Sequence, residues 1–330
     1  MGNYPTVQDE LTPLFSEMYT VVSVTEKKGN VKKALDMFFT FWRHIWKTDV
    51  VIIDTFSTTN FYFALVIGTF CRVLNKPYIN FLHGGDLPLR LKNNPFLSKL
   101  TFKYSYKLVA PSNFMKVSFE KYGYHPVLIP NMLNIANYDL EERDSSKIKL
   151  FWLRSFRKHY NPILAVQVLA KLRNEGWDAD LIMVGPDAQD GSFIEVKDFI
   201  NQNQLEKFVQ TPGVLTKPEW MALSKDRNIL INTTNIDNTP ISVIECMALG
   251  LAIVSTNVGG IPYLLDDNED ALLVKPNSID AMTEAIITLV NNPEKTQQQV
   301  SKAREKVANF DWNVVKNKWV NLLENASKTK

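Results

Sequence analysis

The stretch DNTPISVIECMALGLAIVSTNVGG, residues 237–260, decides how this chain folds. It holds a short apolar segment that Gly250 ends, then the apolar run LAIVST, then two glycines. A helix over 241–249 that follows one apolar strand and precedes another is the repeat of a parallel sheet. Asp237 and Glu245 lie on either side of the helix start. The stretch therefore predicts a doubly wound α/β fold with carboxylates near a helix N-terminus.

Apolar strands alternate with amphipathic helices along the rest of the chain, and the polar segment 137–147 interrupts this alternation. We expect that segment to link two domains. Strands are predicted to begin near 20, 49, 78, 107 and 126, and again near 148, 179, 229, 252 and 271. The predicted domains are 1–140, 147–308 and a C-terminal helix over 309–330, whose apolar side is available for packing on the N-terminal domain.

The first residues, MGNYPT, resemble the loop that follows a strand. A domain of this class normally opens with a central strand. Two explanations stay open: the chain starts late, or the first sheet lacks a strand.

Composition narrows the class of protein. With 45% apolar residues and a net charge of +2, the chain is globular and does not resemble a nucleic-acid binder. Residues 1–135 carry 15 Lys and Arg against 9 Asp and Glu. This excess fits an anionic acceptor or membrane surface, and it fits chance equally well. Cys71 and Cys246 lie in apolar stretches and predict buried thiols in a reducing, cytoplasmic setting.

The residues alone leave two readings of Glu245. Ser242 and Glu245 have the spacing of a capping box, which would stabilise the helix start by about 1 kcal/mol without a ligand. In the second reading the free N–H groups of the helix start bind a phosphate. Glu245 then accepts hydrogen bonds from ribose hydroxyls, and Asp237 holds a sugar hydroxyl.

Together with other motifs, the stretch resembles the E-x7-E motif of the retaining glycosyltransferases of family four. Asp237 and Glu245 stand at the two acids, followed by Cys-Met-Ala-Leu-Gly, an apolar strand and the double glycine at 259–260. HGGD at 83–86 resembles the His-Gly turn of the family's first domain. The resemblance implies the GT-B fold, in which two Rossmann-like parallel-sheet domains face each other across a cleft. It also implies a nucleotide-diphosphate sugar as donor, with no metal and no cofactor.

The resemblance assigns roles residue by residue. The expected catalytic residues are Arg154, Lys158, Asp237 and His83. The expected donor-binding residues are Glu245, Ile241, Ser242, Pro240, Gly84, Gly185 and Gly259.

Three of these positions depart from the family pattern. At the first acid this chain has Asp237 where the family has Glu, which shortens the reach to the sugar by one methylene. Arg154 and a lysine would neutralise the diphosphate, but the family's Lys position falls on His159 here. We choose Lys158, with Arg157 and His159 as alternatives. Pro240 replaces a Gly, which removes one backbone N–H from the helix start.

The expected function is retaining transfer of a sugar to a glycan or lipid-linked acceptor in surface polysaccharide biosynthesis. One alternative is a non-catalytic GT-B partner that binds sugar nucleotide or glycan, and another is a nucleotide-sugar 2-epimerase. A dehydrogenase is the least favoured, because no G-x-G-x-x-G follows a predicted strand. His44 and His125 lack the neighbours of a metal site, so none is expected.

One helical stripe of the first domain has two readings. It reads as core, with a membrane-dipping face as the alternative. Its members are Leu35, Phe38, Phe39, Trp42, Ile45 and Trp46. We expect a cytoplasmic protein. The positive excess of its first domain and the lipid-linked acceptors that the resemblance implies predict a peripheral contact at the inner face of the membrane, with weak, salt-sensitive binding to anionic vesicles.

Overall fold

The protein folds into two units, each with its own parallel sheet and apolar core. The structure is a computed structural model that describes residues 7–24, 30–141, 143–144 and 147–329. The C-terminal unit contains Asn131–Val315, and the N-terminal unit contains Asn3–Pro130 and Lys316–Lys330. The division falls before the segment 137–147.

The N-terminal unit is built on a sheet with the order β1-β2-β3-β4, and all its neighbouring strands are parallel. Its strands are β1 (Val51–Thr55), β2 (Tyr78–Leu82), β3 (Lys107–Ala110) and β4 (Val127–Leu128). Its helices are α1 (Val7–Ser16), α2 (Asn30–His44), α3 (Asn60–Val73), α4 (Leu87–Asn93), α5 (Pro95–Phe102) and α6 (Asn113–Glu120). The helix α14 (Trp312–Ser327) places Trp319 edge-on against Phe15 and Phe81, with ring centroids 5.6 and 5.2 Å away.

The strands predicted near 49, 78, 107 and 126 are confirmed, whereas the strand predicted at 20–24 is wrong. The β-branched composition of residues 20–24 favours a strand, but the segment pairs with none of the described strands. Val22 is 44% exposed. Valines favour a strand only where a neighbouring strand accepts the backbone hydrogen bonds and the side chains are covered. This segment belongs to neither of the described sheets, and its Val22 is left exposed.

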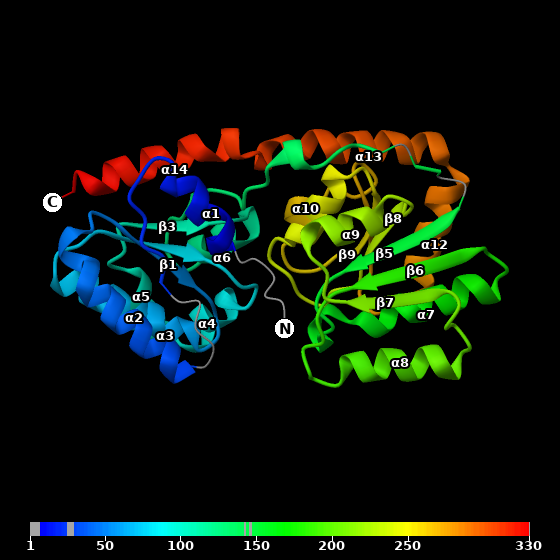
Figure 1. The fold of residues 1–330 in the computed structure, drawn as a ribbon, viewed down its shortest axis with the longest axis horizontal. Helices are drawn as coiled ribbons and strands as arrows, with labels where there is room; N and C mark the ends of the chain where they lie inside the picture. The colour runs from blue at the N-terminus through cyan, green and yellow to red at the C-terminus, as the bar shows by residue number, and fades with distance from the viewer. Residues whose placement is uncertain (1–6, 25–29, 142, 145–146, 330) are drawn as a thin grey trace. The chain divides into compact units, whose positions relative to one another are not determined.

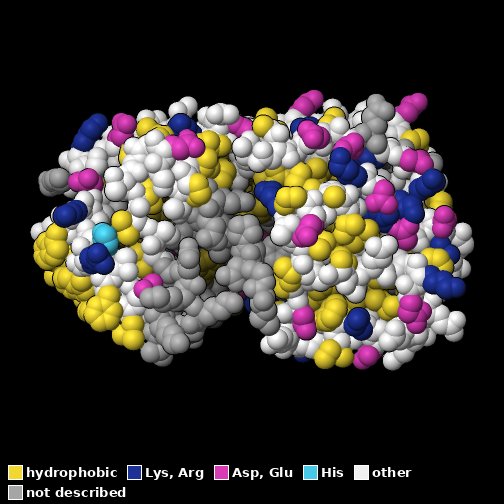
Figure 2. Space-filling view, viewed as in Figure 1, with side chains coloured by type: hydrophobic (Ala, Val, Ile, Leu, Met, Phe, Trp, Pro, Cys, Tyr) yellow, Lys and Arg dark blue, Asp and Glu magenta, His cyan; other side chains and the backbone are white. Residues whose placement is uncertain are grey.

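The predicted stripe, which runs from α2 into the 3-10 turn Ile45–Lys47, is only partly core, and this corrects the preferred interpretation. Ile45 is buried at 2% exposure, but Phe39 and Trp46 are each 67% exposed. Leu35 and Phe38 are also exposed, and Trp42 is half-buried against Phe70. Figure 2 shows hydrophobic side chains gathered along the lower left edge of the view, over α2. The apolar face of α2 is therefore wider than the surface that the N-terminal unit covers.

The C-terminal unit has a sheet with the order β10-β9-β8-β5-β6-β7, also parallel throughout (Figure 1). Its strands are β5 (Ile148–Leu153), β6 (Ala179–Val184), β7 (Val209–Gly213), β8 (Ile229–Asn232), β9 (Ala252–Thr256) and β10 (Leu272–Val274). Its helices are α7 (Pro162–Asn174), α8 (Ser192–Gln202), α9 (Lys217–Ser224), α10 (Ile241–Ala248), α11 (Ile261–Leu264), α12 (Ile279–Asn291) and α13 (Pro293–Val307). The five strands predicted for this domain are confirmed.

Helices cover both faces of this sheet, which explains why its strands are apolar at nearly every position. Alternate residues of β5 enter two separate cores. Leu150 and Trp152 pack with α7 and α12, while Phe151 and Leu153 pack with α10. Figure 1 shows α7, α8 and α12 on one side of the strands and α9, α10 and α13 on the other.

Strand β7 was not predicted, and its position explains why. Its sequence VQTPG contains a proline, which removes a backbone donor and argues against a central strand. In the structure β7 is the edge strand beside β6, where one side of the backbone needs no partner. An edge strand can therefore carry a proline that a central strand would exclude.

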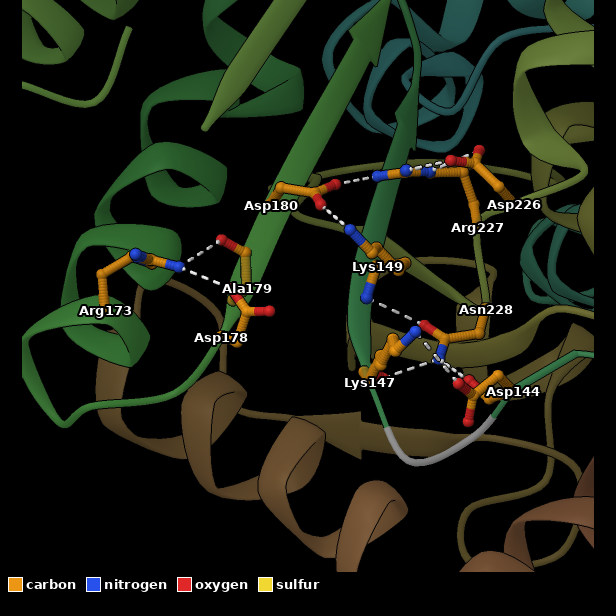
Figure 3. A network of polar contacts seen from close by, with 10 residues as sticks. All are labelled: Asp144, Lys147, Lys149, Arg173, Asp178, Ala179, Asp180, Asp226, Arg227 and Asn228. Carbon is orange, nitrogen blue, oxygen red and sulfur yellow. Dashed lines mark hydrogen bonds and ion pairs between the residues drawn. The ribbon is translucent and has the colours of Figure 1, made fainter. Parts of the chain in front are cut away.

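A polar network fixes the amino ends of β5 and β6, away from the strand ends that carry the predicted site (Figure 3). Asp180 of β6 pairs with Lys149 of β5 and with Arg227, which is buried before β8. The Asn228 side chain accepts a hydrogen bond from the Lys149 N–H at 3.0 Å and donates to the carbonyl oxygen of Asp144 at 2.6 Å. These contacts join the segments at the amino ends of β5, β6 and β8. We therefore interpret the network as structural.

Candidate functional site

The carboxyl ends of β5 and β8 meet at the point where the strand order of the C-terminal sheet reverses. From β5 the chain proceeds outward to β6 and β7, and then returns to β8 on the other side. In open α/β sheets, ligands bind at such a switch point, outside the carboxyl ends of the strands. Arg154 directly follows β5, and Asp237 lies in the loop between β8 and α10. The topology thus brings two predicted site residues to the same place.

Arg154 and Asp237 form an ion pair through the guanidinium Nη2 and the carboxylate Oδ2. Their side chains are 15% and 12% exposed, so the pair is largely shielded from water. The guanidinium lies 4.1 Å from the centroid of the Tyr160 ring, a cation–π contact. Its Nε is buried and has no hydrogen-bond partner among the described residues. Asp237 Oδ1 accepts the N–H of Asn238 at 2.9 Å.

Three glycines bring the backbone segments of this site into contact. A Cβ on Gly185 would lie well inside 3.0 Å of the Arg154 carbonyl oxygen, closer than Cβ atoms approach other atoms. Likewise, a Cβ on Gly259 would meet the carbonyl oxygen of Asp237, and one on Gly260 that of Asn238. The N–H of Gly260 donates to the Asp237 carbonyl at 2.9 Å. The double glycine therefore fastens the loop that carries Asp237.

Helix α10 begins as predicted, but the capping box is wrong. Pro240 is the N-cap, and Ser242 is already inside the helix, where no cap hydrogen bond from a side chain forms. Among the described residues, no hydrogen bond uses the N–H of Ile241 or of Ser242. The helix ends at Ala248, and Gly250, just beyond its C-cap Leu249, has a φ of +76°, the left-handed conformation predicted for it. The two free donors point beyond the start of α10.

The Glu245 side chain, which a capping box would have used, binds two other residues. Its Oε1 accepts the Tyr138 hydroxyl at 2.7 Å and pairs with the Lys217 ammonium at 3.0 Å. Glu245 is 8% exposed, and Tyr138 is buried. Sequence reasoning missed both partners, because Tyr138 lies in a polar run and Lys217 in a segment with no predicted element. The TKPE sequence at 216–219, which forms a capping box in the structure, could have located the start of α9.

The second predicted cation, Lys158, lies in a short 3-10 turn (Lys158–Tyr160) and its side chain is exposed. The Lys158 N–H donates to Asp190 at 2.8 Å. Slight burial raises the pKa of Asp190, but hydrogen bonds from Lys158 and Ser192 outweigh it and lower the pKa to about 2. The His159 carbonyl accepts the N–H of Asn235 at 2.8 Å, which ties this turn to the loop after β8.

His83 and Gly84 belong to the N-terminal unit and follow β2. His83 Nε2 lies 3.1 Å from Oδ1 of Asp54, at the end of the neighbouring strand β1. The imidazole is 7% exposed and packs on Phe81, with ring centroids 4.1 Å apart. Gly84 has a φ of +90°, which glycine adopts without strain. Asp54 was missed, although strands β1 and β2 pair in parallel and their carboxyl ends meet.

The remaining features of the described chain concern metal binding, membrane spans, the two cysteines and one hollow. Among the described residues, no group of His, Cys, Asp and Glu is arranged to hold a metal ion. No helix in the part of the chain that the structure describes has the length and apolar character to cross a membrane. Both cysteines are free and buried, and burial raises the pKa of Cys71 to about 12. A hollow of about 830 Å³ between α7, α8 and the start of α12 contains none of the predicted site residues.

The chain is similar in sequence to known glycosyltransferases. Residues 139–306 match the family model of the glycosyl transferases group 1. The chain is 25% identical over 171 residues to the putative colanic acid biosynthesis glycosyltransferase WcaL of Escherichia coli, covering 49% of this chain and 41% of that protein. It is 26% identical over 130 residues to the poly(ribitol-phosphate) alpha-N-acetylglucosaminyltransferase of Staphylococcus aureus, covering 39% of this chain and 26% of that protein. The chain thus spans less than half the length of these curated relatives.

Solved structures agree on the fold. HepE of Anabaena, in complex with UDP and glucose, superposes with a TM-score of 0.76 at 17% identity over 95% of this chain and 88% of that one. The sucrose-phosphate synthase of Thermosynechococcus elongatus gives a TM-score of 0.77 at 15% identity over 91% and 78%. The predicted fold, α/β with two parallel sheets of the GT-B type, is confirmed.

Proposed function

This chain belongs to the group 1 glycosyl transferases, and on that basis we propose that it transfers a sugar from a nucleotide-diphosphate sugar with retention of the anomeric configuration. The acceptor in this proposal is a glycan or a lipid-linked acceptor in surface polysaccharide biosynthesis. The name of one relative, a colanic acid biosynthesis glycosyltransferase, supports the pathway class. The shielded Arg154–Asp237 pair at the switch point, beside the free N–H groups of α10, is the observation that carries the proposal.

The leaving diphosphate lies at the start of α10 in this proposal. The C1–O bond of the donor breaks and its electron pair stays on the diphosphate oxygen. The acceptor oxygen attacks C1 from the same face and passes its proton to that oxygen. Arg154 and the N–H groups of Ile241 and Ser242 stabilise the growing negative charge. The unpartnered Nε of Arg154 supplies a further donor. Lys158, exposed on the neighbouring turn, adds a second cation.

The two acids hold the sugars. Glu245 accepts hydrogen bonds from the ribose of the nucleotide, and Asp237 from a hydroxyl of the transferred sugar. Asp237 already binds Arg154 and Asn238, but two carboxylate oxygens have about four lone-pair sites and can accept another donor. Gly259 lets the backbone of Asp237 approach closely, and Gly185 does the same for the backbone of Arg154. Sugar contacts from His83 and Gly84 in the N-terminal unit stay a prediction.

The proposal is tested by a thermal-shift panel of UDP-, GDP-, ADP- and dTDP-sugars, followed by assays of hydrolysis and transfer on each hit. A ligand at 100 times its Kd should stabilise the folded protein by about 2.7 kcal/mol. The anomeric configuration of the product, read by NMR, tests retention, and activity in EDTA tests the proposed independence from metal. Absence of any stabilising nucleotide sugar would refute the function.

Two other outcomes would favour the alternatives. Binding without hydrolysis or transfer, even with lipid-linked acceptors, would favour a non-catalytic partner. Conversion of the donor into its C2 epimer would favour an epimerase. Product of inverted configuration would leave sugar transfer in place and refute retention alone.

A peripheral contact with anionic membrane is part of the same proposal, and the exposed face of α2 supports it. Phe39 of α2 and Trp46 of the 3-10 turn that follows it are exposed, and Arg43 and Lys47 nearby are exposed as well. Aromatic rings flanked by basic side chains suit the interface of an anionic bilayer. Such a contact would bring the enzyme to a lipid-linked acceptor.

A further inference from the structure

The carboxylate of Glu245 is held at only one of its two oxygens. Both the Tyr138 hydroxyl, at 2.7 Å, and the Lys217 ammonium, at 3.0 Å, bind Oε1. No hydrogen bond or ion pair of the described residues uses Oε2. A buried carboxylate normally has its acceptor positions filled, because an unsatisfied buried acceptor is costly. Glu245, 8% exposed, therefore keeps one oxygen available for a ligand.

The two partners of Glu245 are themselves fixed by separate elements. Tyr138 is 2% exposed, and its carbonyl accepts a hydrogen bond from Arg304 of α13 at 2.9 Å. Lys217 is the first residue of α9, whose start is held by a capping box between Thr216 and Glu219. The Lys217 ammonium also lies 5.0 Å from the centroid of the Tyr138 ring. The two donors are therefore preorganised, and they arrive at Oε1 from outside α10.

We infer that Tyr138 and Lys217 are positioning residues, which grip Oε1 of Glu245 and so present Oε2 to the adjacent hydroxyls of the donor ribose. This inference rests on the function proposed above. A glutamate side chain has three rotatable bonds, and two charge-assisted hydrogen bonds on one oxygen fix its rotamer before the ligand arrives. Neither partner needs to touch the nucleotide.

The test separates positioning from general support of the fold by changing the ribose. The wild-type protein is titrated by calorimetry with ADP, GDP and UDP, and with the 2′,3′-dideoxy form of each. The nucleotide that binds is then titrated into Tyr138→Phe, Lys217→Gln and Lys217→Arg. We expect the first two variants to lose roughly tenfold in affinity for the ribonucleotide and to bind the dideoxy form as the wild type does. Lys217→Arg, which keeps the cation, should recover most of the loss.

A double change adds a second readout. Once Glu245→Gln has removed the carboxylate, Tyr138→Phe should cause no further loss of affinity for the ribonucleotide. Lys207→Gln and Tyr122→Phe, changes of exposed residues of the same types, should behave as the wild type.

The outcomes distinguish the inference from its premise. Equal losses for the ribonucleotide and the dideoxy form would mean that Tyr138 and Lys217 act on the fold or on another part of the ligand, which overturns positioning and leaves the function intact. A wild-type protein that binds none of the nucleotides would overturn the proposed function and this inference with it.

Discussion

Replacing Gly260 with alanine is expected to displace the loop that carries Asp237. Gly260 has a φ of −85°, which alanine adopts without strain, so the effect must come from contact alone. The new Cβ would fall well inside 3.0 Å of the Asn238 carbonyl oxygen. That oxygen belongs to the backbone and cannot rotate away as a side chain would. The loop must therefore move, together with the Asp237 carbonyl that accepts the Gly260 N–H.

The magnitude follows from what the movement breaks. Overpacking in a tight site costs about 1–3 kcal/mol, and the lost hydrogen bond adds roughly 1 kcal/mol. A total of about 3 kcal/mol corresponds to a fall in Tm of roughly 6–12 °C for a domain of this size. Because the Arg154–Asp237 pair moves with the loop, affinity for the nucleotide sugar should fall by at least about tenfold.

Scanning calorimetry and nucleotide-sugar titration measure the two effects, and Gly176→Ala is the matched control. Gly176 has a φ of +87° and no atom within 4 Å of its virtual Cβ, so alanine there meets only backbone strain. That strain costs about 1 kcal/mol and lies away from the site. If Gly260→Ala were no more destabilising than Gly176→Ala and bound the donor normally, the double glycine would not fasten the Asp237 loop.

Three further predictions concern other parts of the chain. Arg154→Lys should lower turnover by roughly a hundredfold, because lysine keeps the charge but loses the planar guanidinium and its contact with the Tyr160 ring. The control is Arg173→Lys, which should leave turnover unchanged; the Arg173 guanidinium lies 3.7 Å from the Phe208 ring centroid. The pKa of Asp190 is lowered from 3.8 to about 2 in the folded protein. The ionised Asp190 therefore stabilises the fold fully above about pH 4, and this contribution is lost as the pH falls towards 2. The difference in Tm between the wild type and Asp190→Asn should disappear over the same pH range. Combined Phe39→Ser and Trp46→Ser changes should abolish salt-sensitive sedimentation with phosphatidylserine vesicles, whereas Ile194→Ser, an exposed residue of the other unit, should not.

The fold could be predicted from the sequence because its strongest signals are local. Apolar strands bounded by turns and helices of 3.6-residue period identify β5, β6, β8 and β9 without any knowledge of their partners. The errors arise where a partner decides the outcome. Residues 20–24 have strand composition but no strand beside them, and β7 has a proline that only its place at the sheet edge permits.

The segment 137–147 shows the same dependence on partners. Its polar composition predicts a linker, yet Tyr138 and Arg143 pack into the C-terminal unit. Arg143 donates to the carbonyl oxygens of Leu249 and Ser224, at the C-terminal ends of α10 and α9. Its guanidinium there satisfies carbonyl groups that a helix end leaves free. A composition count cannot find such a role, because the acceptors are backbone atoms about 80 and 106 positions away.

The sequence motifs name candidate residues for the site, but they could not predict how these residues pair. The family resemblance assigned Arg154 to the diphosphate and Asp237 to the sugar as independent residues, whereas the structure joins them in a shielded ion pair. Removing one member of such a pair leaves a buried charge without compensation, at a cost of about 3–5 kcal/mol. An Asp237→Ala variant would therefore lose stability, and a fall in its activity could not be assigned to the chemistry of Asp237. Asp237→Asn keeps the side-chain volume and a hydrogen-bond acceptor for Arg154, so it is the substitution that separates the charge of this acid from its place in the fold.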